Sequence, residues 1–186
     1  MSIREIEFAT YGTTNIDPIT LVFTLACGIS LLVIPRRSCG TPLALVAGLI
    51  PNAERLVVFS LDFSMLRIVL LFGIMRFLFK PADAKIEFNL LDRLIVFWAA
   101  IGSIIYVAGS GISGAIVYKL GHCFELLGIY FLARLLIKDL TDAQILVSKF
   151  ALVTILIAIG VLFELATQYN IFSILGGVPE LSLIHI

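Results

Sequence analysis

Six runs of apolar residues follow one another along the chain, separated by short polar stretches. A helix that crosses a bilayer needs about 20 apolar residues, within a range of about 17–25. Helices are the default in lipid because they satisfy their own backbone hydrogen bonds, and the alternating ten-residue pattern of a membrane barrel is not seen. The pattern predicts an all-α fold, a polytopic membrane helix bundle with five to six transmembrane segments. The six segments cover residues 18–34, 41–58, 64–79, 94–108, 122–137 and 150–163.

Polar residues before several of these runs predict where helices begin. Asp17, followed by a proline, is suited to cap the first segment, and Thr41 with its proline repeats this chemistry before the second. Asn89 stands where the fourth segment needs a cap. Thr141 and Gln144 have the three-residue spacing of a capping box before the sixth.

The second segment leaves alternatives open. Its purely apolar run ends at Pro51, which is short for a membrane span. The chain can continue as a helix through "NAERLVVF", break there, or re-enter the membrane. If this segment does not span, the N-terminus and residues 35–63 change sides, whereas the later segments keep their orientation.

Basic residues predict the orientation, since short cytoplasmic loops carry an excess of Lys and Arg. If all six segments alternate and the first ends in the cytoplasm, nine basic residues fall at cytoplasmic ends and four at outer ends. The cytoplasmic set is Arg36, Arg37, Arg76, Lys80, Lys85, Arg93, Arg134, Lys138 and Lys149, and the outer set is Arg4, Arg55, Arg67 and Lys119.

Composition supports a membrane protein. Of the 186 residues, 60% are hydrophobic and 14% charged, against about 45–50% and about 25% in soluble domains. The formal net charge is zero, so no basic field points to nucleic acid. Three widely spaced cysteines form no CxxC pair, which favours small helix residues over a metal site or a disulfide framework. The sequence therefore predicts a single membrane domain over residues 1–180, with membrane lipid as its solvent.

Known catalytic and binding motifs do not identify a functional site in this sequence. "GSGISG" at 109–114 fits the glycine spacing of a dinucleotide fingerprint but lacks the preceding strand and the βαβ context, so we interpret it as a turn. The sequence has no His, Cys and carboxylate cluster with metal-ligand spacing and no nucleophile elbow. We therefore expect no metal and no cofactor.

Three outer basic residues are the best candidates for a site. Arg55, Arg67 and Lys119 fall near the outer leaflet, and Arg67 opposes the helix dipole in the first turn of its segment. One hypothesis is that they bind a lipid-linked pyrophosphate, because Arg pairs bidentately with phosphate oxygens. The alternative is internal pairing with the acids Glu54, Asp62 and Glu125.

His122 and Glu125 are weaker candidates. Their spacing of three places them on one helix face near the outer end of the fifth segment, three residues after Lys119. Ionisable groups at membrane depth are costly and often functional. The alternative is an interfacial position in which Lys119 snorkels to the membrane surface.

Three stretches carry a resemblance to a known family: "IPRRSCGTPLALVAGLIPNAERLVVFSLDFSMLRIVLLFGIMRFL" (34–78), "YKLGHCFELLGIYFLARLLIKD" (118–139) and "NIFSILGGVPE" (170–180). They resemble the N-terminal half of the O-antigen ligase/O-antigen polymerase family of bacterial multi-span membrane proteins. The resemblance implies an inner-membrane glycosyltransferase that moves a glycan from an undecaprenyl-pyrophosphate carrier to a lipid or glycan acceptor on the periplasmic side. The family is expected to use a periplasmic loop with Arg and His, which nothing in residues 1–180 matches, so no catalytic residue is assigned.

The last six residues, "LSLIHI" (181–186), are the in-frame translation of a transposon mosaic-end sequence used in sequencing libraries. We expect them to derive from an adapter, and we expect the chain to be an N-terminal fragment that is inactive alone. A different class of function also fits the composition, namely a fragment of a transporter or a structural membrane subunit. A transporter would favour broken helices and polar groups at mid-bilayer, whereas the predicted spans have apolar centres.

Overall fold

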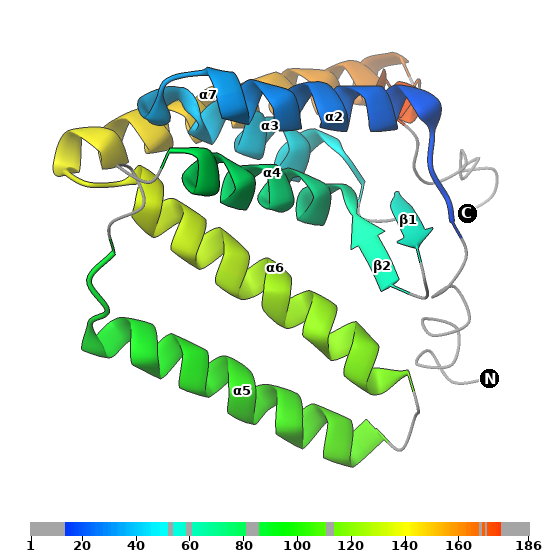
Figure 1. Cartoon of the computed structure of the whole chain (residues 1–186). Helices are drawn as coiled ribbons and strands as arrows, with labels where there is room; N and C mark the ends of the chain where they lie inside the picture. The colour runs from blue at the N-terminus through cyan, green and yellow to red at the C-terminus, as the bar shows by residue number, and fades with distance from the viewer. Residues whose placement is uncertain are drawn as a thin grey trace.

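The structure, a computed structural model, describes residues 14–51, 54–58, 61–80, 86–110, 114–167, 169 and 171–175. It is predominantly helical, and Figure 1 shows long helices that reverse direction from one to the next. The α-helices are α2 (Pro18–Val33), α3 (Gly40–Leu49), α4 (Met65–Phe79), α5 (Leu90–Ser110), α6 (Ala115–Leu136) and α7 (Leu140–Thr167). The remaining elements are the 3-10 turns η1 (Arg36–Ser38) and η3 (Ile171–Leu175) and the strands β1 (Arg55–Val58) and β2 (Leu61–Ser64).

The alternation of direction gives the molecule two ends. The hairpin end holds β1 and β2 and the starts of α2, α4 and α6 (Figure 1). The arginine end holds η1 and the starts of α3, α5 and α7. The helices of the described residues therefore alternate in direction along the chain, and the predicted helical fold is confirmed for this part of it.

Helix starts show which predicted caps form. Asp17 caps α2 by accepting hydrogen bonds from the backbone N–H groups of Ile19 and Thr20. Asn89 caps α5: its side chain accepts from the Asp92 N–H, and the Asp92 carboxylate accepts from the Asn89 N–H. Both predictions are confirmed, and the second is a reciprocal capping box.

Two other predicted caps are wrong. The cap position of α3 is Cys39, which makes no side-chain capping bond, so the helix begins before Thr41. Helix α7 begins at Leu140, and the Asp139 carboxylate, rather than Thr141, accepts the Asp142 N–H at 2.7 Å. Asp139 caps α7 in place of Thr141 because Asp is a better N-cap residue than Thr.

The second segment breaks. Helix α3 has 10 residues and spans about 15 Å, half of the about 30 Å hydrocarbon core. Pro51 follows its end, and the chain then forms an antiparallel hairpin in which Arg55 pairs with Ser64 and Val57 with Asp62. The prediction of an all-α chain is therefore corrected at this hairpin.

A core lies between α2, α3, α4 and α6. Leu31, Val46, Val69, Leu70 and Leu132 are buried in it. Glycines allow the helices to approach closely: a Cβ added to Gly28 would lie 2.5 Å from the Phe72 ring. Small residues that let backbones approach are typical of helix packing in lipid, where van der Waals contact replaces the hydrophobic effect.

Three helices, α5, α6 and α7, are long and apolar enough to cross a membrane. Helices α2 and α4, with 16 and 15 residues, reach only about 22–24 Å. These data indicate membrane association, while the count of five to six spans stays a prediction.

The surface of α5 fits a lipid environment. Figure 1 shows α5 beside α6, on the side away from α2 and α7. Phe97 and Trp98 are consecutive helix residues, so their side chains leave the helix about 100° apart, and both are more than 60% exposed. Apolar residues exposed over most of a helix surface are expected where lipid, rather than water, is the solvent.

Candidate functional site

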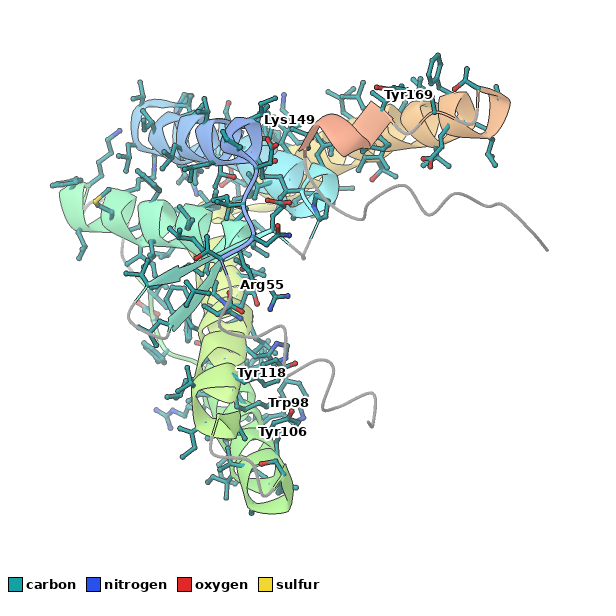
Figure 2. All side chains as sticks on the ribbon, turned by 90° about the vertical axis from the view of Figure 1, so that its right-hand side faces the viewer. Arg55, Trp98, Tyr106, Tyr118, Lys149 and Tyr169 are labelled. Carbon is teal, nitrogen blue, oxygen red and sulfur yellow. The ribbon has the colours of Figure 1, made fainter. Side chains whose placement is uncertain are left out.

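The hairpin end brings together two of the three predicted basic residues with two acids. Arg55 in β1 forms an ion pair with Asp62 in β2, with 3.3 Å between the guanidinium and the carboxylate. Antiparallel pairing of the strands places these side chains within reach, because their residues are diagonal neighbours in the register. Figure 2 shows Arg55 at this end of the molecule.

Arg67 lies deeper, in the first turn of α4, and is 8% exposed. Its guanidinium donates to the backbone carbonyl of Asp62 and lies 3.4 Å from the Glu125 carboxylate of α6. The Nε atom of Arg67 is buried and has no acceptor among the described residues. Arg67 is thus held in place by Asp62 and Glu125 but keeps a spare donor.

Two residues of α6 shape the surroundings of Arg67. Gly121 packs directly on the guanidinium, since an added Cβ there would lie 2.7 Å from one of its nitrogens. Glu125 accepts a 2.8 Å hydrogen bond from the Ser64 hydroxyl, and the same hydroxyl accepts the Arg67 N–H as the cap of α4. One network therefore joins the end of β2, the start of α4 and the middle of α6.

Lys119 is not part of this network. Its ammonium lies 5.0 Å from the centre of the Tyr106 ring, a cation–π contact between α6 and α5. Tyr106 in turn packs on Tyr118 with ring centres 5.7 Å apart, and both rings are labelled in Figure 2. His122 is exposed on α6. The structure thus groups Arg55, Arg67 and Glu125, and separates Lys119 from them.

The arginine end contains a second charged cluster. In the sequence, its basic residues served only to predict the orientation of the helices, and their acidic partners were not predicted. Asp92 of α5 is fully buried, accepts a 2.6 Å hydrogen bond from the Tyr130 hydroxyl and forms an ion pair with Arg134. Tyr130 and Arg134 are four residues apart on α6, so both face the same position on α5. The i, i+4 spacing of Tyr130 and Arg134 is visible in the sequence. Their shared partner, Asp92, could not be predicted because it depends on how α5 packs against α6.

Asp142 anchors the start of α7 in the same way. Its carboxylate is 2.7 Å from the guanidinium of Arg36 and 2.9 Å from that of Arg37. The Lys138 N–H also donates to it at 3.1 Å. The two arginines of η1 therefore tie the α2–α3 connection to the α6–α7 connection.

Basic side chains at this end also cap helix C-termini. Arg76 donates to the carbonyls of Leu31 and Ile34 at the end of α2, and Lys80 donates to that of Leu32. Arg36 donates to the Leu136 carbonyl at the end of α6. These carbonyls have no partner within their own helices, and cations also complement the negative end of the helix dipole.

No group of three His, Cys, Asp or Glu that could hold a metal ion is found in the part of the chain that the structure describes. Several predictions fall wholly or partly outside that part, among them Arg4 and Lys85 of the charge distribution. Residues 111–113 of the predicted turn and the tail at 181–186 are among the residues not described, as is most of the "NIFSILGGVPE" stretch.

The sequence matches no protein-family model, and neither a curated protein nor a solved structure was found to match it.

Proposed function

We propose that the chain forms the N-terminal membrane portion of a glycosyltransferase of the O-antigen ligase/polymerase type, located in the bacterial inner membrane as a multi-pass protein. Such an enzyme transfers an undecaprenyl-pyrophosphate-linked glycan to a lipid or glycan acceptor. The observation that best supports the proposal is the position of Arg67, a nearly buried cation at the end of the bundle that the charge distribution assigns to the outer side.

The chemistry of glycan transfer gives Arg67 a role. Pyrophosphate leaves readily when fixed cations stabilise the charge that develops on it. Arg67 is fixed by the Asp62 carbonyl and by Glu125, and its Nε retains an unused donor among the described residues. Its ion pair with Glu125 has a distance of 3.4 Å, whereas a strong charge-assisted bond measures about 2.7–2.9 Å. Glu125 is therefore a weak competitor of a phosphate group for the Arg67 guanidinium.

Arg55 and Lys119 are assigned supporting roles in the proposed site. Arg55 neighbours Arg67 through Asp62, which contacts both residues. Lys119 lies on the face of α6 that meets α5, outside the Arg67 network, and its ammonium carries three donors that a second part of the lipid-linked ligand could use. Glu125 and His122 receive no catalytic role, because the general base is expected from a loop that this sequence does not match.

The experiment is a binding measurement on the chain in lipid nanodiscs. Undecaprenyl-pyrophosphate-linked N-acetylglucosamine is titrated and detected by native mass spectrometry, with undecaprenyl monophosphate and phosphatidylglycerol as competitors. We expect Arg67→Ala and Lys119→Ala each to weaken binding about tenfold or more, as the loss of one charge-assisted contact predicts. Lys149→Ala on α7, shown in Figure 2, is the matched control and should bind like wild type. Unchanged affinity in both site variants would refute the proposal.

A second candidate function, a fragment of a membrane transporter, is favoured by one observation. Helix α3 stops after 10 residues and is followed by irregular chain and a hairpin. Discontinuous helices whose ends bind substrate or ions are typical of secondary transporters. Uptake of a labelled ion or solute into proteoliposomes would separate this function from glycan transfer.

A further inference from the structure

Glu54 is a buried acid that the proposed glycan site does not use. It lies between the end of α3 and the start of β1 and is 2% exposed. One carboxylate oxygen accepts a 2.8 Å hydrogen bond from the Asp17 N–H at the start of α2. No Lys, Arg or His side chain of the described residues lies within 4.0 Å of this carboxylate.

A buried carboxylate without a cation is energetically unfavourable. Removing the charged carboxylate from water costs roughly several kcal/mol of solvation free energy. A single backbone hydrogen bond does not compensate for this cost. The nearest basic residue in sequence, Arg55, forms its ion pair with Asp62 on the other strand. Among the described residues, the Glu54 carboxylate is therefore left without a positively charged partner.

A small pocket adjoins Glu54. Its volume is about 30 Å³, enough for one or two water-sized species. The pocket is lined by residues at and just after the end of α3 and by residues at the start of α4: Val46, Ala47, Ile50, Pro51, Glu54, Ser64, Met65 and Leu66. The pocket thus lies where a short helix ends against a buried acid.

The end of α3 makes this pocket attractive to a cation. The carbonyls of the last turn of a helix lack internal partners and carry the negative end of the helix dipole. Ile50 donates its N–H to the Val46 carbonyl, but Pro51 has no N–H to donate to the carbonyl of Ala47. The end of α3 and the Glu54 carboxylate therefore both contribute negative electrostatic potential in this pocket.

We propose that this pocket binds one sodium-like monovalent cation, with the Glu54 carboxylate as the charged ligand and α3 carbonyls and the Ser64 hydroxyl as neutral ligands. These are hard oxygen donors, which suit alkali and alkaline-earth cations. One carboxylate balances one positive charge, whereas divalent calcium sites usually gather several carboxylates. The Ser64 oxygen accepts one hydrogen bond, from Arg67, and has a second lone pair available.

Cation binding would join three elements at the hairpin end. Glu54 already bonds to the start of α2, and the cation adds the end of α3 and the residue that caps α4. Sodium is therefore expected to stabilise the folded chain. This inference goes beyond glycan transfer and does not depend on it.

The test compares the thermal stability of the chain in detergent at increasing NaCl, with choline chloride added to keep the ionic strength constant. We expect the Tm to rise with sodium and to saturate, and we expect saturable binding of ²²Na⁺ in a scintillation proximity assay. Glu54→Gln should lose both effects, and its Tm in choline should exceed that of wild type because the uncompensated buried charge is gone.

Asp139→Asn is the control for removal of one negative charge. Its side chain is half exposed at the arginine end, and asparagine preserves the cap of α7. It should keep the sodium response of wild type. Equal Tm values in sodium and choline for wild type, or an unchanged sodium response in Glu54→Gln, would overturn the proposal.

Discussion

Replacing Gly121 by alanine probes how tightly Arg67 is held. The added Cβ would lie 2.7, 2.9 and 3.1 Å from three guanidinium atoms of Arg67. Normal contacts are about 3.5–4.0 Å, so the guanidinium must move by several tenths of an ångström or more. It is the far end of a flexible side chain, but moving it disturbs its bonds to the Asp62 carbonyl and to Glu125.

The magnitude follows from two opposing effects. Overpacking typically costs about 1–3 kcal/mol, and loss of a hydrogen bond to a charged group costs about 1.5–3 kcal/mol. Against this, alanine favours a helix interior over glycine by about 0.8–1.0 kcal/mol. Gly102 of α5 provides the matched control, since it is exposed and an added Cβ meets nothing within 4 Å. The helix-propensity gain cancels in the comparison, so Gly121→Ala should be about 1–3 kcal/mol less stable than Gly102→Ala.

The assay is reversible unfolding of the chain in mixed micelles with increasing sodium dodecyl sulfate. A double-mutant cycle completes it: in an Arg67→Ala background the obstacle is gone, so Gly121→Ala should behave like Gly102→Ala. We expect a coupling free energy of about 1–3 kcal/mol between positions 67 and 121. Equal stabilities of the two single alanine variants, or a coupling near zero, would refute the packing of Arg67 on Gly121.

Three further predictions concern caps and topology. Asp17→Ala should lower the free energy of unfolding by about 0.5–2 kcal/mol in the same assay, while Asp17→Asn, which retains a capping oxygen, should cost little. Arg36→Ala should lower the Tm, because one side chain pairs with Asp142 and caps α6; a Tm equal to that of wild type would contradict both contacts. Leu61→Cys and Leu140→Cys, exposed at opposite ends, should react differently with an impermeant maleimide applied to intact cells, and only Leu61→Cys should be labelled from outside.

Local signals predicted the helices well where a cap stands directly beside an apolar run. The first and third segments were expected over 18–34 and 64–79, and α2 and α4 occupy Pro18–Val33 and Met65–Phe79. Hydropathy failed where a helix extends beyond its apolar part. Helix α6 begins at Ala115 rather than near His122, because a helix can carry Lys119 on its surface without ending.

The hairpin and the charged networks depend on information that lies outside any short window. Strand formation by Arg55–Val58 requires pairing with Leu61–Ser64, and strand propensity varies with such tertiary context. The contact between Arg67 and Glu125 joins residues 58 positions apart and exists because α4 packs on α6. The sequence predicted that an internal acid was available to Arg67 but could not select Glu125 among the three.

The arginines that cap α2 and α6 contribute at two stages, first during membrane insertion and then in the folded protein. During membrane insertion, before the helices pack, Arg36 and Arg76 contribute only their positive charge, which biases the side on which their loops remain. After folding, the same guanidinium groups are hydrogen-bond donors to the carbonyls of Leu31, Ile34 and Leu136. Lysine would preserve the first contribution and lose the forked geometry of the second. The Arg76→Lys variant is therefore expected to insert in the membrane with the orientation of wild type but to have a less stable folded state. This single substitution would thus distinguish the contribution of Arg76 to membrane insertion from its contribution to stability.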